Sequence, residues 1–142
     1  MNKTVLKKIS TNKAATPLGH YSQAIVHENT IYLATQLGIP PGNGPFEVGT
    51  IEQQTNQIID NVEQILIAAG GNLDQIIKVM IYISDISLWP KVNEIYAKRF
   101  RDHKPARGVI PCQTLHKGYQ VAFDVIAARC HPEERITCHA ER

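Results

Sequence analysis

Three features are scarce in this 142-residue sequence: long apolar runs, aromatic residues and cysteines. No apolar run reaches the roughly 20 residues that a membrane-spanning helix needs, so we expect no membrane partner. Three cysteines at irregular spacing argue against a disulfide framework. The first 27 residues lack arginine as well as acidic residues, whereas transit peptides are rich in arginine. We therefore expect a cytoplasmic protein.

A strong excess of one charge is also missing. The chain has 15 basic and 13 acidic residues and a net charge of +2, so nothing in its composition favours a nucleic-acid partner. Its hydrophobic content of 43% and charged content of 20% are typical of a globular protein. A chain of this length can bury a sizeable core, and we expect one domain.

Near the end of the chain, two Cys-His pairs raise the hypothesis of a metal site. The pairs are Cys130-His131 and Cys138-His139, and their spacing matches none of the common zinc patterns. The segment between them is polar and terminal. We therefore predict no metal site, a single domain over residues 1–130, and a flexible tail over residues 131–142.

Hydrophobic periodicity predicts an α+β fold, with a mixed sheet of five to six strands and two helices on one face. Thr50 and Gln53 form a capping-box pattern at the start of the first helix, and Gly70-Gly71 ends it. The second helix starts between Ser87 and Pro90 and has an inner stripe that ends at Arg99 or Phe100. The predicted strands lie at 4–9, 24–26, 31–34, 76–84, 105–111 and 119–129.

The last predicted strand carries a carboxylate within an apolar segment. Asp124 points to the face opposite Phe123, and an unpaired buried carboxylate is costly. Arg107, in the preceding strand, is its best partner. Two interpretations follow: a structural ion pair, or an anionic-substrate site with a cation and a nearby base. The face with Asp124 is too apolar to stay wet, so we expect identical subunits to cover it. Its apolar members are Met80, Tyr82, Ala122, Ile126 and Ala128.

Several motifs in order resemble one known family, the RidA/YjgF reactive-intermediate deaminases. Residues 15–24 (A-T-P-L-G-H-Y-S-Q-A) are similar to its A-P-x-x-G-P-Y-S-Q-A signature. The helix end at 61–71, the V-N-E-I-Y segment at 92–96 and the P-A-R turn at 105–107 also match. The similarity covers residues 4–129.

The resemblance implies a chorismate-mutase-like fold and a homotrimer with clefts between its subunits. It also implies hydrolysis of enamines and imines such as 2-aminoacrylate, 2-iminobutanoate or 2-iminopropanoate to 2-keto acids and ammonia, without a metal or an organic cofactor. Arg107 takes the place of the carboxylate-binding arginine, and Asp124 that of a water-orienting glutamate. The corresponding cleft-lining positions are Tyr21, Thr35, Asn93 and Val109.

The sequence departs from the family pattern at several of these positions. Thr35 replaces a small residue before the glutamine, Val109 replaces a cysteine or similar small residue, and Asp124 is one methylene shorter than glutamate. A larger enamine acid such as 2-aminomuconate is therefore a second candidate substrate. Two further hypotheses are RNA binding or cleavage, since the family has carried an endoribonuclease label, and a non-catalytic metabolite-binding trimer.

Overall fold

The computed structural model describes residues 5–130. Its strands are β1 (Leu6–Ile9), β2 (Ala24–His27), β3 (Thr30–Leu33), β4 (Gln36–Leu37), β5 (Ile76–Ile83), β6 (Ala106–Pro111) and β7 (Val121–Ala128). The α-helices are α1 (Ile51–Ala69) and α2 (Trp89–Phe100). The strands form one sheet in the order β1-β2-β3-β7-β5-β6, and β4 also pairs with β7. All pairs are antiparallel except β5 with β6, so the sheet is mixed.

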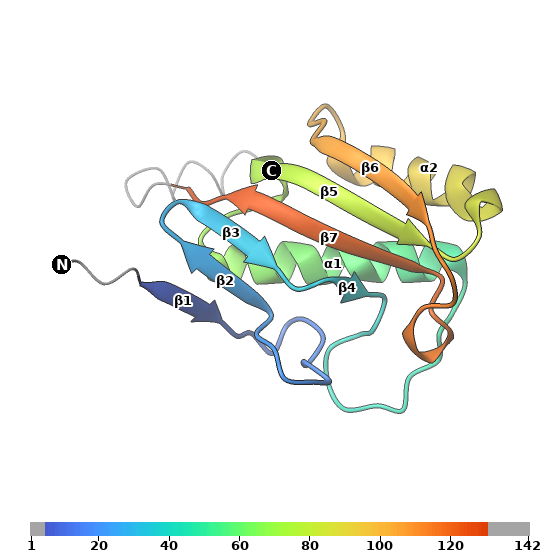
Figure 1. Cartoon of the computed structure of the whole chain (residues 1–142), viewed down its shortest axis with the longest axis horizontal. Helices are drawn as coiled ribbons and strands as arrows, with labels where there is room; N and C mark the ends of the chain where they lie inside the picture. The colour runs from blue at the N-terminus through green and yellow to red at the C-terminus, as the bar shows by residue number, and fades with distance from the viewer. Residues whose placement is uncertain (1–4, 131–142) are drawn as a thin grey trace.

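Both helices pack on the same face of the sheet (Figure 1), as the sequence predicted. The predicted α+β class is confirmed, but the count of five to six strands was too low. The additional strand is β4, whose two residues are too few to show an alternating pattern. Residues 131–142, and with them the predicted tail and the second Cys-His pair, lie outside the described residues. No helix within residues 5–130 is long and apolar enough to cross a membrane.

Helix α1 begins and ends at the residues that its sequence signals indicate. The Gln53 N–H donates to the Thr50 hydroxyl at 3.1 Å, and the Thr50 N–H donates to the Gln53 side chain at 2.9 Å. These two bonds form a reciprocal capping box. At the other end, Gly70 has a φ of 90°, a conformation that favours glycine.

We expect the Thr50→Ala variant to lose about 1 kcal/mol of unfolding free energy, because the Gln53 N–H then lacks its acceptor. Urea denaturation followed by circular dichroism measures the loss. The Thr50→Ser variant retains the hydroxyl and should stay close to the wild type. Equal losses in both variants would show that the cap contributes nothing.

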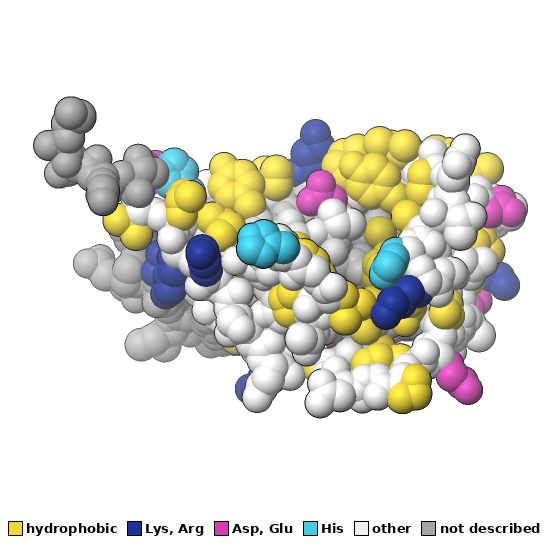
Figure 2. All heavy atoms as spheres, turned by 60° about the horizontal axis from the view of Figure 1, so that its bottom comes forward, with side chains coloured by type: hydrophobic (Ala, Val, Ile, Leu, Met, Phe, Trp, Pro, Cys, Tyr) yellow, Lys and Arg dark blue, Asp and Glu magenta, His cyan; other side chains and the backbone are white. Residues whose placement is uncertain are grey.

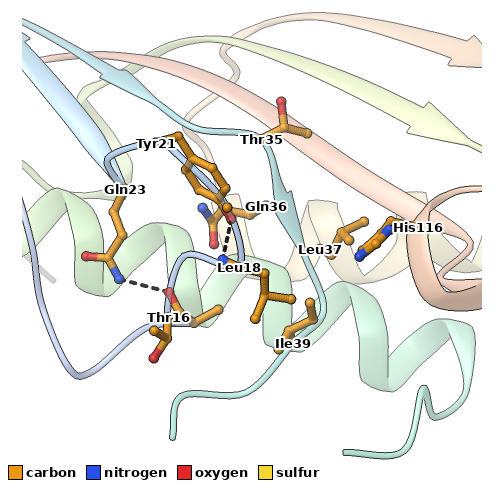
Figure 3. A pocket seen from close by; sticks show the side chains of 11 residues that line it. Thr16, Leu18, Tyr21, Gln23, Thr35, Gln36, Leu37, Ile39 and His116 are labelled. Carbon is orange, nitrogen blue, oxygen red and sulfur yellow. Dashed lines mark hydrogen bonds between the residues drawn. The ribbon is translucent and has the colours of Figure 1, made fainter. Parts of the chain in front are cut away.

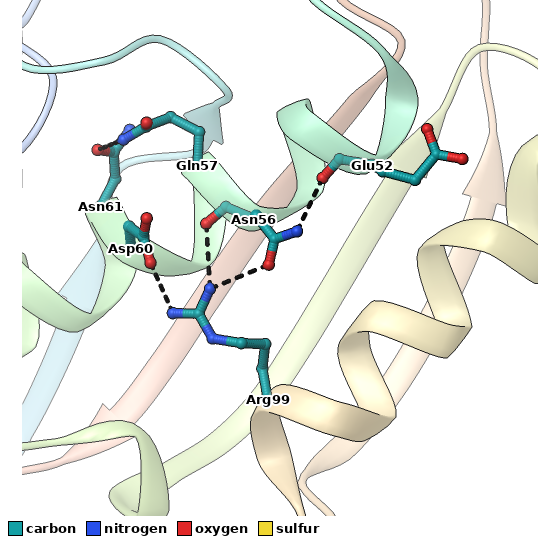
Figure 4. A network of polar contacts seen from close by, with 6 residues as sticks. All are labelled: Glu52, Asn56, Gln57, Asp60, Asn61 and Arg99. Carbon is teal, nitrogen blue, oxygen red and sulfur yellow. Dashed lines mark hydrogen bonds and ion pairs between the residues drawn. The ribbon is translucent and has the colours of Figure 1, made fainter.

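Polar contacts join α2 to α1 across the helix-covered face (Figure 4). The Arg99 Nη2 lies 2.7 Å from the Asp60 Oδ1, and its Nη1 donates to the Asn56 Oδ1 at 3.2 Å. Phe100, the other candidate for the end of the inner stripe, is 3% exposed. Phe100 thus belongs to the core, whereas Arg99 fastens α2 beside α1.

Strand β5 contains an irregularity that reverses part of its predicted pattern. Ile76 aligns with Ala127 and Lys78 with Ile126, so the β5 strand carries an extra residue between them. Ile77 is therefore 50% exposed, whereas Ile76 is 2% exposed. Ile77 therefore departs from the alternation of Val79, Ile81 and Ile83, because a β-bulge shifts that alternation by one residue.

The sheet face opposite the helices carries apolar side chains that one chain alone does not cover. Tyr32 is 45% exposed and Ile110 41%, while Met80, Tyr82 and Ile126 are half-buried. In Figure 2, hydrophobic side chains gather around an acidic group along the upper part of the molecule. Burial of this face by identical subunits stays a prediction.

Candidate functional site

Arg107 lies on β6, the strand at one edge of the sheet. It aligns with the fully buried Val79 of β5, so its side chain leaves the sheet on the helix-covered face. Its Nη1 donates to the Asn93 Oδ1 at 3.0 Å. Its guanidinium carbon lies 4.8 Å from the ring centroids of both Trp89 and Tyr96. Arg107 is nevertheless exposed, so three side chains hold a cation that solvent can reach.

Helix α2 presents these three side chains to Arg107 because of their spacing. Trp89, Asn93 and Tyr96 are separated by four and then three residues, which places them along one side of a helix. The predicted cleft residue Asn93 therefore does lie beside the predicted carboxylate-binding residue Arg107.

The Tyr96 hydroxyl has no hydrogen-bond partner in the described part of the chain, although the residue is only 6% exposed. Burial raises the pKa of Tyr96, while the positive charge of Arg107 acts in the opposite direction. The Tyr96 ring stacks on Phe100 with 4.3 Å between centroids, which fixes its orientation. Tyr96 thus contributes its ring, rather than a hydrogen bond, to the surroundings of Arg107.

A hollow of about 390 Å³ opens beside the Arg107 side chain. Arg101 and Lys104 also line it, and no acidic residue of the described chain does. The His103 Nε2 lies 2.8 Å from the Ile76 carbonyl oxygen, so this ring nitrogen donates. Because the charged side chains among its described lining residues are all cations, this hollow attracts anions.

The backbone of β6 adds hydrogen-bond donors at the free edge of the sheet. The Cys112 N–H donates to the Ile83 carbonyl of β5 at 2.8 Å. Because N–H directions alternate along a strand, those of Arg107 and Val109 point away from β5. Val109 also aligns with the buried Ile81, so its side chain projects from the same face as that of Arg107. β6 ends at Pro111, which has no N–H.

Tyr21 and Thr35 line a different hollow of about 200 Å³ (Figure 3). The Tyr21 hydroxyl accepts a hydrogen bond from the Leu18 N–H at 3.3 Å, which leaves its proton able to donate. Leu18 and His116 line the same hollow. Tyr21 is 52% exposed, and so is available to a small molecule or to another chain.

The two hollows have no lining residue in common. Thr35 follows β3, and two strands lie between β3 and β6, which puts these strands about 14 Å apart. The chain thus groups Asn93 with Arg107, and Tyr21 with Thr35, but it does not bring the two groups together.

Asp124 projects from the opposite face of the sheet to Arg107. It aligns with Met80 of β5, whereas Arg107 aligns with the preceding residue, Val79. Within residues 5–130 no ion pair joins Asp124 to Arg107. The structural ion pair considered from the sequence is therefore wrong for a single chain, because side chains one register step apart point to opposite faces.

Thr35 is the predicted cleft residue that precedes β4. Gln36, the first residue of β4, pairs with Phe123, the neighbour of Asp124 in β7. Asp124 is half-buried and has no hydrogen-bond or ion-pair partner among the described residues. No three His, Cys, Asp or Glu side chains within residues 5–130 gather in a way that could hold a metal ion.

A protein-family model described as Endoribonuclease L-PSP matches residues 11–129. This chain belongs to the endoribonuclease L-PSP family. A RutC family protein of Pyrococcus horikoshii is 40% identical over 119 residues, which are 84% of this chain and 94% of that protein. The 2-iminobutanoate/2-iminopropanoate deaminase of Bos taurus is 35% identical over 129 residues, 91% of this chain and 94% of the relative. The crystal structure of yeast Mmf1 has a TM-score of 0.84 and 32% identity, and the match covers 89% of this chain and 100% of that one.

These comparisons confirm the RidA/YjgF resemblance that the motifs indicated, and a solved structure named for the Rid family agrees with them. Relatives about one-third identical are named imine deaminases, which supports an imine deaminase role for the L-PSP family.

Tyr96 and His116 each line one of the two hollows, and the Trp89 ring lies against Arg107, although the sequence analysis assigned none of the three to the site. The spacing of Trp89, Asn93 and Tyr96 carried the signal, but only the position of β6 shows that Arg107 lies over them. His116 is exposed and lines the Tyr21 hollow.

Proposed function

We propose that this protein hydrolyses small 2-imino acids, such as 2-iminobutanoate and 2-iminopropanoate, to 2-keto acids and ammonia. The observation that carries the proposal is the solvent-accessible Arg107 guanidinium. Asn93, Trp89 and Tyr96 hold it beside a hollow that no acidic residue of the described chain lines. The 35% identity to a bovine protein named for this reaction supports it.

In this proposal Arg107 binds the carboxylate of the substrate. A planar guanidinium can form two parallel hydrogen bonds with a carboxylate. Among the described residues, the Arg107 side chain makes one hydrogen bond, to Asn93, so further N–H donors remain for the substrate. The outward N–H of Val109 is a further donor on the same strand. With the carboxylate fixed, the C=N carbon takes a defined place, and positioning of this kind is the main rate contribution that an electrophilic imine needs.

Water then adds to the C=N carbon and gives up a proton while the nitrogen gains one. Collapse of this adduct breaks the C–N bond, releases ammonia and leaves a C=O group. Asp124 is the residue we assign to orient the water and take its proton, and Tyr21 donates a hydrogen bond to the substrate. Arg107 and Asp124 leave opposite faces of one sheet, so a site that uses both takes them from different copies of the chain.

We assign the active assembly as a homotrimer whose subunit boundaries bring the Tyr21 hollow of one copy to the Arg107 edge of the next. The partly exposed apolar face around Met80 and Tyr32 supports contacts between copies. The separation of the two hollows within one chain supports a composite site.

The test follows the decay of 2-iminobutanoate that an L-amino-acid oxidase generates in situ, with catalase present to remove peroxide. Wild-type protein should accelerate the decay. Asp124→Ala should slow it at least about tenfold if the carboxylate acts as a base, while Asp124→Glu should retain or raise the rate. Imine decay at the same rate with and without protein would reject this activity, and equal rates for wild type and Asp124→Ala would remove Asp124 from the mechanism.

A further inference from the structure

The Arg107 guanidinium lies between two aromatic rings of the same helix. Its central carbon is 4.8 Å from the centroids of both Trp89 and Tyr96, within the range of a cation–π interaction. Among residues 5–130 its side chain also makes one hydrogen bond, to Asn93. Attraction to ring faces does not use N–H donors, so most of the donors of Arg107 remain for a ligand.

We propose that Trp89 and Tyr96 form an aromatic clamp that holds the Arg107 guanidinium ready to receive a carboxylate. The two residues are positioning residues, since they act through Arg107. This inference rests on the proposed role of Arg107 in binding the substrate carboxylate, and it adds the residues that determine how tightly the carboxylate binds.

The need for a clamp follows from the position of Arg107. β6 has a neighbouring strand on one side only, and an exposed arginine side chain loses considerable rotamer freedom when a ligand immobilises it. A side chain that is already held loses less, so the ligand binds more tightly.

The two rings are themselves fixed. The Tyr96 ring stacks on Phe100 inside the core, and its hydroxyl has no partner among the described residues, which leaves the ring as the part that acts on Arg107. Trp89 begins α2, follows the turn Ile86–Leu88, and packs partly buried against the core. A substitution of Trp89 therefore changes the clamp without opening the centre of the core.

The first measurement is the binding of 2-oxobutanoate, the product of the proposed reaction, by isothermal titration calorimetry. Trp89→Leu keeps an apolar side chain and removes the aromatic face, so its dissociation constant should rise about five- to tenfold. Trp89→Phe keeps a smaller aromatic face, so its dissociation constant should lie between those of the wild type and Trp89→Leu. Ile86→Ala, at an exposed residue of the preceding turn, is the matched control and should bind as the wild type does.

The second measurement separates positioning from a structural role. Loss of the clamp weakens the binding of the substrate and of the transition state equally. Trp89→Leu should therefore raise KM and leave kcat within about twofold of the wild type. A merely structural loss would lower kcat through the fraction of folded protein and leave KM unchanged. Trp89 is also the only tryptophan of the chain, so its fluorescence should change on titration with 2-oxobutanoate, and this change should be absent in Arg107→Ala.

Equal affinities for 2-oxobutanoate in wild type and Trp89→Leu would overturn the clamp while leaving Arg107 as the carboxylate-binding group. A wild type that binds no 2-oxobutanoate would overturn the clamp together with the proposed function. Thermal denaturation of each variant confirms that the compared proteins are folded.

Discussion

The Arg107→Ala variant should lose about 100-fold or more in kcat/KM for 2-iminobutanoate, equivalent to about 2.7 kcal/mol of transition-state stabilisation. Arg107 lies over the rings of Trp89 and Tyr96 on α2 and also lines the hollow, which no acidic residue of the described chain lines. Without it the carboxylate has no two-point partner, and the C=N carbon is no longer held in one place. Steady-state decay of the imine measures the loss.

Arg107→Lys is the informative companion variant. Lysine keeps the charge but offers a single ammonium in place of the planar fork, and it stacks less well on Trp89 and Tyr96. We expect it to recover only a small part of the lost kcat/KM. If Arg107→Lys had the kcat/KM of the wild type, a positive charge alone would be sufficient. If Arg107→Ala had the kcat/KM of the wild type, Arg107 would be excluded from the site.

Mixed assemblies test whether the site lies between two copies. Arg107→Ala and Tyr21→Ala proteins, unfolded together and refolded at equal amounts, should regain activity. If each site takes Arg107 from one chain and Tyr21 from the next, about one-quarter of the sites contain both wild-type residues. Sites built within single chains would regain nothing.

The Gly38→Ala variant should lose about 3 kcal/mol of unfolding free energy, because the added methyl group has no space. A Cβ at Gly38 would lie 2.8 Å from both the Cα and the carbonyl oxygen of Gln54, which are backbone atoms of α1. The segment cannot simply move away, since the Asn61 side chain donates to the Ile39 carbonyl at 2.8 Å. Denaturant unfolding measures the loss, and a fall in Tm of about 10 °C should accompany it.

Gly19→Ala is the matched control for this prediction. A Cβ at Gly19 would meet Tyr21 ring atoms at 3.5 Å or more, an ordinary van der Waals contact. Its unfolding free energy should stay within about 0.5 kcal/mol of the wild type. A Gly38→Ala protein as stable as Gly19→Ala would show that the β4–α1 junction can open at little cost.

Local signals in the sequence were sufficient for most of the fold. The capping box at Thr50, the αL glycine at Gly70 and the alternation of β7 depend on residues close in sequence, and each lies where predicted. The bulge beside Ile77 was missed because it depends on the register between β5 and β7, which periodicity within one strand does not reveal.

The candidate site could be predicted only in part, for a similar reason. The motifs identified Arg107, Asn93, Tyr21 and Thr35, but not that they divide between two hollows. The face that each side chain occupies depends on strand pairing: Arg107 shares a register with Val79, and Asp124 with Met80. The proposed catalytic and substrate-binding roles of these residues stay predictions.

The proline that closes β6 has a consequence for how the protein avoids aggregation. The edge strand of a sheet can pair with strands of other chains. The edge that carries Arg107 must nevertheless stay accessible if a substrate is to reach it. Cys112 turns its N–H toward β5, so the ring nitrogen of Pro111 faces outward, where it offers no bond to an incoming strand. Pro105, just before the strand, also lacks an N–H, so the outward backbone donors of this edge are those of Arg107 and Val109. The two prolines thus reduce the number of backbone donors at the edge that carries Arg107, which lowers the tendency of this edge to pair with strands of other chains.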